Sequence, residues 1–383
     1  MKKYPRTLLL TNIAAPYRLP LFDALGEQME LIVYFCQSSP PDRRWRPDLE
    51  SERVRFVQLS HRTRQLFGMG PAWIWNSGLR ARLREEQFDV YISGENVLAA
   101  PSVLAVQSAA RREGRPFILW SGAIDTPYAS GNWLSNLYRR WLYRRTDAFV
   151  AYGKRAKAFL VKRGGAPDRI STGTQVIAPG WIWQVPGDKR GLDLEGQTVV
   201  LYVGYLVPRK GVADLIHAYQ RVHRPDTTLV IVGDGPKQAE LKAIAKSDAD
   251  IRFTGYLEGE AKWRYYASAD LFVLPTYHDP WSQVINEAMY FGLPIITTDR
   301  DGSVHEVVQD GDNGLIIPAG DVSALAEALE HLLADEPLRR QMGERSRAII
   351  ADYTLEAACS AFLQAISHAL EEHDPTNHKS LAQ

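Results

Sequence analysis

Cysteine is scarce in this chain of 383 residues, which holds only Cys36 and Cys359. Two cysteines cannot build a disulfide framework, and by themselves they cannot hold a four-ligand zinc ion. We therefore expect a reducing, cytoplasmic compartment. The nine histidines show no His-x-x-x-His pairing, so we expect no catalytic metal either.

Long apolar runs are also missing. The longest stretches without a charge are residues 96–110 and 170–187, and both contain proline, so neither predicts a transmembrane helix. The basic N-terminus followed by Leu8–Leu10 resembles the start of a signal peptide, but Thr11 and Asn12 interrupt the run. We interpret it as a first buried strand.

The formal net charge is zero, yet the two halves of the chain differ in sign. Residues 1–180 carry 27 Lys and Arg against 15 Asp and Glu, and residues 181–383 carry 18 against 30. The first half is therefore expected to face an anionic partner, such as a membrane surface or a phosphorylated acceptor, unless the two halves simply attract each other. Nucleic acid is not expected, because no recognised nucleic-acid-binding module is present.

Short apolar runs alternate with helix-length segments along nearly the whole chain, which predicts parallel sheets covered by helices on both faces. The predicted strands are Thr7–Leu10, Leu31–Phe35, Val90–Ser93, Phe117–Trp120, Ala148–Ala151, Thr198–Val203, Thr228–Val232, Ile251–Phe253, Leu271–Leu274, Ile295–Thr297 and Gly314–Ile317.

The length fits two domains, and a cluster of proline and glycine separates them. We predict an N-terminal Rossmann-like domain over residues 1–180, a linker over 181–196 and a second Rossmann-like domain over 197–354. Residues 355–383 are expected to form a helix and a tail that packs back on the first domain.

The most informative segment is residues 278–289, which follow a predicted strand and open a short helix, Gln283–Phe291, with Ser282 at its N-cap. The free backbone N–H groups at 282–284 and the helix dipole favour a bound anion, phosphate above all. Asp279 and Glu287 lie beside this turn, and carboxylates accept hydroxyl hydrogen bonds well. The alternative is that the acids only complement the helix dipole.

A second strand-end loop, residues 202–211, carries Gly204, which permits close backbone approach, and the cations Arg209 and Lys210. These cations suit a phosphate, although an Arg-Lys pair in a loop is also typical of a solvated surface. A third loop, Gly233–Pro236, is no dinucleotide fingerprint, and no G-x-x-x-x-G-K-[ST] loop occurs.

In order and spacing, these loops resemble the donor domain of the family-4 glycosyltransferases. The resemblance runs from Val199 to about Leu333. It implies a retaining enzyme of the GT-B fold, an α/β architecture of two Rossmann-like doubly wound domains facing across a cleft. The first domain, residues 1–180, would then lie on the acceptor side, and the second, residues 197–354, would bind the donor. It also implies that Glu287 binds the donor ribose and Asp279 a hydroxyl of the transferred sugar. The donor diphosphate would be bound by Arg209 and Lys210 together with the backbone at Ser282, Gln283 and Val284, with Gly204 and Tyr256 also in the donor site.

The chain departs from the family pattern at several positions. Asp279 stands where glutamate is commoner, and Tyr205 where many members have an arginine, for which Arg209 would compensate. In the first half, alanines replace two glycines, and no histidine follows the strand at 117–120. The candidate acceptor-side residues are Tyr17, Arg18 and Asp125.

The resemblance implies transfer of a sugar from a nucleoside-diphosphate sugar to a lipid-linked or saccharide acceptor, in surface polysaccharide or glycolipid assembly, without metal or cofactor. An aromatic helix around Trp133 and Trp141, ringed by arginine, would allow peripheral binding at the inner face of the membrane. An ordinary helix with one buried face explains that pattern equally well. Two other functions stay open: a nucleotide-sugar epimerase of the same fold, and an inactive nucleotide-sugar-binding protein.

Overall fold

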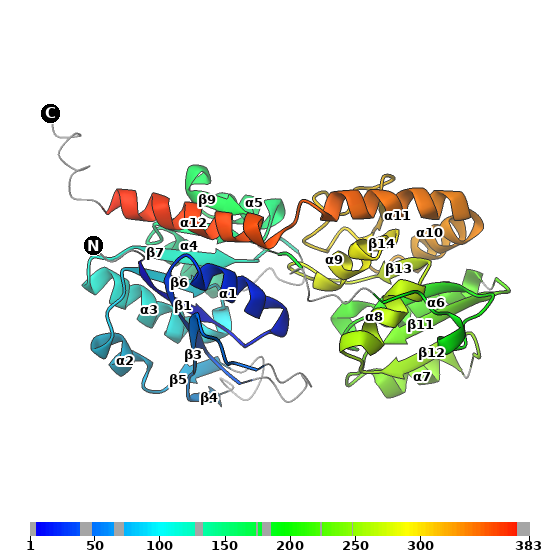
Figure 1. Ribbon diagram of the computed structural model, residues 1–383, viewed down its shortest axis with the longest axis horizontal. Coiled ribbons are helices and arrows are strands. Elements are labelled where there is room, and N and C mark those ends of the chain that lie inside the picture. Colours follow the sequence, from blue (N-terminus) through cyan, green and yellow to red (C-terminus); the bar gives the residue numbers. More distant parts are fainter. Residues whose placement is uncertain are drawn as a thin grey trace. The chain divides into compact units, whose positions relative to one another are not determined.

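A computed structural model describes residues 5–38, 48–64, 73–126, 133–173, 175–177, 185–222, 224–246 and 248–373 of the chain. The chain divides into two compact units (Figure 1). Unit 1 consists of Met1–Asp125, Ser130–Thr174 and Leu355–Gln383, and unit 2 of Thr126–Ala129 and Gln175–Thr354. Each unit is built around its own parallel sheet.

A seven-stranded parallel sheet forms the centre of unit 1, in the order β3-β2-β1-β6-β7-β8-β9. The chain reverses its direction across the sheet between β1 and β6, the kind of switch point at which such sheets bind ligands. The strands are β1 (Arg6–Thr11), β2 (Glu30–Phe35), β3 (Val54–Gln58), β6 (Val90–Gly94), β7 (Phe117–Ser121), β8 (Ala148–Ala151) and β9 (Ile170–Thr172), beside an antiparallel hairpin of β4 (His61–Arg64) and β5 (Trp73–Asn76). The α-helices are α1 (Leu19–Gly26), α2 (Leu79–Glu85), α3 (Ala100–Arg112), α4 (Trp133–Tyr143), α5 (Lys154–Lys162) and α12 (Leu355–Glu372).

Unit 2 contains a six-stranded parallel sheet in the order β12-β11-β10-β13-β14-β15. Its strands are β10 (Thr198–Val203), β11 (Thr227–Val232), β12 (Ile251–Gly255), β13 (Leu271–Leu274), β14 (Ile295–Thr298) and β15 (Gly314–Ile317). Its α-helices are α6 (Val212–Val222), α7 (Gln238–Ala245), α8 (Gly259–Ser268), α9 (Gln283–Tyr290), α10 (Val322–Ala334) and α11 (Glu336–Ile350).

Every strand predicted from an apolar run is present, because strands buried on both faces by helices read as continuous apolar stretches. The central strands β10, β11 and β13 are buried along almost their whole length. Four strands escaped the sequence analysis: β3, β4, β5 and β9. β4 consists of half-buried and exposed polar residues, and β9 is only three residues long, so neither leaves an apolar run to detect.

The described part of the expected linker, residues 185–196, groups with unit 2. Leu194 is buried, and Lys189 forms an ion pair with Asp270 at 2.7 Å, which fixes this segment beside β13. Residues 181–184 lie outside the described part of the chain. At the other end, α12 packs on unit 1, where Phe362 meets Trp120 of β7 with ring centroids 5.3 Å apart.

No single helix among the described residues is long and apolar enough to cross a membrane. The consecutive helices α11 and α12 meet that criterion of length and composition only when taken together across a bend.

Candidate functional site

Three loops of unit 2 leave the same edge of its sheet. Because β10, β13 and β14 are parallel neighbours, the segments that follow them gather at the carboxyl ends of the strands. The loop after β10 includes the short 3-10 helix η6 (Pro208–Lys210), and the loop after β13 leads to α9. These are two of the three strand-end loops that the sequence analysis singled out.

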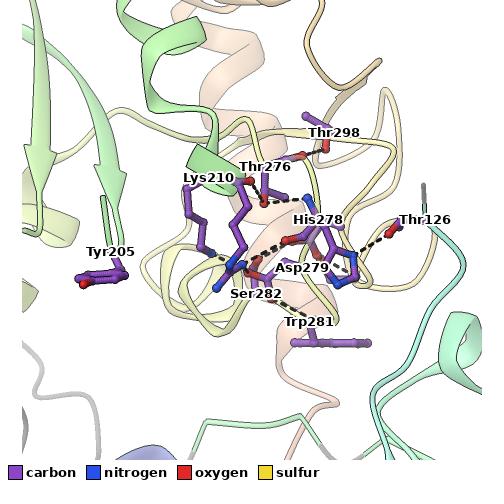
Figure 2. Close-up of polar contacts among 12 residues, drawn as sticks. Thr126, Tyr205, Lys210, Thr276, His278, Asp279, Trp281, Ser282 and Thr298 are labelled. Carbon is purple, nitrogen blue, oxygen red and sulfur yellow. Dashed lines mark hydrogen bonds and ion pairs between the residues drawn. The ribbon is translucent and has the colours of Figure 1, made fainter. Parts of the chain in front are cut away.

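A carboxylate and two cations form the centre of this edge (Figure 2). Lys210 Nζ donates to Oδ2 of Asp279 at 2.6 Å, and Arg209 Nη1 donates to the same oxygen at 3.0 Å. The side chains of Lys210 and Asp279 are 9% and 12% exposed, so this ion pair is largely buried. Burial raises the pKa of Asp279, but the charges of Lys210 and Arg209 outweigh it and hold that pKa well below its usual range.

The backbone holds the two loops tightly together. The carbonyl of Arg209 accepts from the backbone N–H of Tyr277 at 2.8 Å and from Thr276 Oγ1 at 3.0 Å. Gly211 adopts a φ of +67°, and a Cβ there would lie 2.0 Å from the carbonyl oxygen of Pro275. Only glycine suits both constraints. The cations and Asp279 are therefore placed by backbone contacts as well as by their own charges.

Asp301 is a second buried carboxylate of this edge, and the sequence analysis missed it. Its Oδ1 accepts from the backbone N–H of Ser303 at 2.9 Å and from Ser303 Oγ at 2.6 Å, and the Ser282 hydroxyl donates to its Oδ2. Burial and the negative charge of Asp279 raise the pKa of Asp301. An aspartate shortly after the predicted strand at 295–297 was the available signal.

Ser282 stands at the N-cap of α9, as predicted, but its hydroxyl is directed to Asp301 and caps no backbone N–H. The first-turn N–H groups at 282–284 thus lack a side-chain cap and an intrahelical partner. The neighbouring Gln283 donates to the carbonyl of Val176 at 2.6 Å, while its buried Oε1 has no hydrogen-bond partner among the described residues.

Glu287 lies one turn into α9 and is 5% exposed. Its Oε1 accepts from Lys262 Nζ of α8 at 3.0 Å, and its Oε2 accepts from the hydroxyl of Tyr266 at 2.8 Å. Burial and the adjacent Glu287 charge raise the pKa of Tyr266 well above its usual value, so this hydroxyl stays a donor. Because an ionised carboxylate offers about four acceptor positions, Glu287 keeps capacity for a ligand diol.

The other predicted donor residues are less closely grouped. Gly204 lies directly beyond β10, and its carbonyl oxygen would be 2.0 Å from a Cβ on Gly233, so these two turns pack backbone against backbone. Tyr205 lies apart from the Asp279 cluster (Figure 2), and the Tyr256 hydroxyl donates to Glu258 at 2.8 Å. His278, which the sequence analysis did not choose, shares a 2.8 Å hydrogen bond with Thr126 through its Nδ1.

The candidate acceptor-side residues belong to unit 1. The guanidinium of Arg18 lies 4.6 Å from the ring centroid of Trp120, and Arg18 donates to the hydroxyls of Thr11 and Tyr152. Its Nε is buried without a hydrogen-bond partner among the described residues. Tyr17 lies beside it, with the Arg18 guanidinium 5.7 Å from the Tyr17 ring centroid.

Asp125, the third of these candidates, forms ion pairs with Lys162 at 2.8 Å and Arg163 at 2.9 Å. The hydrogen bond from Lys162 is the largest cause of its lowered pKa. Its carboxylate is 45% exposed and already holds two cations, so it is less available to a ligand than Arg18.

A buried carboxylate in unit 1 also went unpredicted. Glu95 follows β6 directly, and its carboxylate accepts from Arg139 Nε at 2.7 Å, from the Tyr143 hydroxyl at 2.9 Å and from Ser121 Oγ. With the Glu95 side chain 3% exposed, this network locks α4 to the strand ends of the sheet. The residues in the described part of the chain include no group of three or more His, Cys, Asp or Glu side chains placed to hold a metal ion.

Two family models match the chain, one over each unit. The model described as Glycosyl transferase 4-like domain matches residues 16–172, and the model described as Glycosyl transferases group 1 matches residues 188–349. The chain belongs to the family-4 glycosyltransferases. The family predicted from the loops of the second half is thus confirmed.

Curated relatives of this family-4 glycosyltransferase act in sugar transfer. It is 31% identical to the lipopolysaccharide core biosynthesis glycosyltransferase LpsE of Rhizobium meliloti over 185 residues, 47% of this chain but only 53% of LpsE. It is 26% identical to the alpha-D-kanosaminyltransferase of Streptomyces kanamyceticus over 324 residues, 76% of this chain and 82% of that protein.

Among solved structures, the family-4 glycosyltransferase resembles HepE of Anabaena in complex with UDP and glucose. The TM-score is 0.74 at 17% identity, with 95% of this chain and 100% of HepE covered. At this identity the likeness establishes the fold alone. It confirms the predicted GT-B class, with two α/β units built on parallel sheets.

Proposed function

We propose that this family-4 glycosyltransferase is a retaining enzyme that needs no metal ion. It transfers a sugar from a nucleoside-diphosphate sugar to a lipid-linked or saccharide acceptor in surface polysaccharide or glycolipid assembly. The observation that carries the proposal is the cluster of Arg209, Lys210 and Asp279 at the strand ends of unit 2, next to the start of α9.

Arg209 and Lys210 serve as the cations for the donor diphosphate. As the bond between the sugar C1 and the phosphate oxygen breaks, negative charge grows on the leaving diphosphate, and fixed cations stabilise it. The N–H groups at 282–284 add donors at the positive end of the α9 dipole. Two side-chain cations and a helix N-terminus together take the part that a divalent metal plays in other phosphate sites.

Retention of the anomeric configuration follows if the acceptor hydroxyl attacks on the same face that the diphosphate leaves. The acceptor oxygen forms the new bond to C1, and its proton passes to the departing phosphate oxygen. This route needs no protein nucleophile.

Glu287 binds the ribose diol with the acceptor positions that Lys262 and Tyr266 leave open. The unpartnered Oε1 of Gln283 supplies a further acceptor for a donor hydroxyl or N–H group. Asp279 accepts from a hydroxyl of the transferred sugar once the diphosphate has taken over the two cations.

On the acceptor side, Arg18 is the residue that the contacts favour. Its hydrogen-bond partners are neutral hydroxyls, and its guanidinium stacks on Trp120. A cation held in this way suits an acceptor that carries a phosphate or a carboxylate, as a lipid-linked saccharide does. A basic first half of the chain fits the same acceptor at an anionic membrane surface.

The test begins with thermal shifts against UDP-, GDP-, ADP- and dTDP-sugars in the presence of EDTA. A donor at about 100 times its Kd adds about 2.7 kcal/mol of stability. The selected donor is then incubated with lipid extracts or saccharides, and the products are analysed by mass spectrometry and NMR. A glycosylated acceptor with the donor's anomeric configuration supports the proposal. A changed free sugar nucleotide would identify an epimerase, and donor binding without any product would identify an inactive binding protein.

A further inference from the structure

A basic cavity lies at the edge of the unit 1 sheet opposite to Arg18. Its volume is about 460 Å³, and it is lined at the start of β7 by Phe117 and just before β8 by Asp147. It therefore opens at the amino ends of the strands, whereas the acceptor-side candidates follow their carboxyl ends. Five arginines line it: Arg111, Arg115, Arg144, Arg145 and Arg169.

Part of this positive charge is not neutralised within the described residues. Arg169 pairs with Glu372, and Arg115 is 3.7 Å from Asp89. The side chains of Arg111 and Arg144 form no hydrogen bond or ion pair with another described residue. Asp147, the acid of the cavity wall, accepts from the backbone N–H of Phe117 at 2.7 Å and is 3.3 Å from His373. The cavity is therefore suited to an anion with several oxygens, such as a phosphate group.

An exposed apolar stripe adjoins this cavity. On α4, Trp133, Leu134, Leu137 and Trp141 are 72%, 54%, 59% and 39% exposed. Their spacing puts them along one side of the helix, while the next residue, Leu142, is fully buried in the core of unit 1. The largest apolar side chains of this helix therefore face outward. Large apolar groups gathered on one exposed face are typical of a binding surface.

Arg145 connects the stripe to the cavity. It lines the cavity, its guanidinium lies 4.3 Å from the Trp141 ring centroid, and its Nη1 donates to the Trp141 carbonyl at 3.4 Å. Tryptophan beside arginine, with leucine one turn away, is the composition of helices that lie in the headgroup region of a bilayer.

We propose that the α4 stripe and the arginine cavity form one binding face for an anionic phospholipid bilayer. The stripe enters the interfacial layer, and the cavity receives a lipid headgroup phosphate. The inference extends the proposed membrane-linked acceptor but does not involve the donor site, so the two can fail separately.

The experiment is co-sedimentation of the full chain with vesicles of phosphatidylcholine that contain or lack phosphatidylglycerol. We expect binding that requires phosphatidylglycerol and weakens with salt. The double variant Arg111→Ala/Arg144→Ala should lose affinity about 25-fold, since each arginine near an anionic surface contributes about fivefold. Leu134→Ser/Leu137→Ser should lose about tenfold or more.

The matched control is Arg80→Ala/Arg82→Ala, which removes the same charge from exposed positions on α2. If this control lost as much vesicle affinity as the Arg111/Arg144 variant, the cavity would have no specific role, and only the total positive charge would matter. No preference for phosphatidylglycerol would overturn the membrane face. The membrane face would also be overturned if the chain bound no vesicles but was stabilised by soluble pyrophosphate in a way that requires Arg111 and Arg144. That result would assign the cavity to a soluble anion. Thermal shifts with the donor should be the same in all these variants, whatever the vesicles show.

Discussion

Replacing Asp279 by alanine removes the carboxylate that two cations share. Lys210 and Arg209 both donate to its Oδ2. After Asp279→Ala, the ammonium of Lys210, which is only 9% exposed, loses its counter-ion. The variant therefore tests whether the loop depends on an anion at this point.

The size of the effect follows from burial. Removing one partner of a buried ion pair costs about 3–5 kcal/mol, because the remaining charge stays desolvated. Arg209 is 30% exposed and can rehydrate, so we expect the lower end, about 3 kcal/mol. In a unit of this size that amounts to a fall in Tm of roughly 6–12 °C.

The assay is a thermal melt with and without inorganic pyrophosphate. Pyrophosphate competes with Asp279 for the cations in the natural protein, but it meets them unopposed in the variant. It should therefore raise the Tm of Asp279→Ala by more than that of the natural chain, and at about 100 times its Kd it should restore about 2.7 kcal/mol. The matched control is Asp270→Ala, which breaks the partly exposed pair with Lys189 at the opposite edge of the same sheet.

Two results would refute this reasoning. If Asp279→Ala melted at the natural temperature, the cations would not depend on the carboxylate. If pyrophosphate stabilised Asp279→Ala and Asp270→Ala to the same degree, the anion would bind elsewhere, and Arg209 and Lys210 would lose their proposed role.

The remaining predictions concern pH and four other positions. The folded pKa of Asp279 is depressed, so its stabilising effect is present above the unfolded pKa of about 4 and fades as the pH falls below that value. The melting temperatures of Asp279→Ala and the natural chain should therefore converge as the pH is lowered below about 4. Glu287→Gln should reduce kcat/KM for the donor about 10- to 100-fold, measured by product formation; unchanged kinetics would remove Glu287 from the site. Arg18→Gln should raise the acceptor KM about tenfold and Arg18→Lys by less, with the same donor thermal shift; a loss of donor binding would contradict an acceptor role. Burial raises the pKa of the Cys36 thiol to about 12 and that of Cys359 to about 11, so a thiol reagent at pH 8 should label neither until unit 1 unfolds; labelling of the native chain would show that this core opens.

The sequence predicted the sheets well because of how they are buried. A strand such as β10 packs against helices on both faces, so the residues after Thr198 form a buried, mostly apolar run that is visible by itself. The hairpin of β4 and β5 could not be found in this way, since its register pairs Arg62 with Trp75 and Arg64 with Trp73 at positions that are largely exposed. Its pairing is a cross-strand property, which no single stretch of sequence displays.

The loops that form the site could be predicted from the sequence, but the hydrogen-bond and ion-pair partners of their residues could not. The positions of Lys210, Asp279 and Glu287 at strand ends could be inferred, because the order of strands brings their loops to one edge. The partner of Glu287 could not, because Lys262 lies on another helix and its spacing there resembles that of any solvated lysine. Asp301 escaped notice for a similar reason. Its role depends on the hydrogen bond that it accepts from Ser282, and only the folded chain brings these two residues together.

The shared ion pair gives a physical reason for an aspartate at position 279. Arg209 and Lys210 are neighbours on one short helix, and two such cations would repel each other and destabilise the loop if no anion were near. Oδ2 of Asp279 accepts from both, and its negative charge offsets that repulsion. Under the proposed function, the diphosphate then replaces one anion by another, and the released carboxylate is left beside the sugar with its acceptor positions open. A glutamate here would be longer by one methylene and would have to fold back to reach the same two donors. Asp279→Glu should therefore keep the charge, lose part of the stability, and transfer sugar more slowly than the natural chain.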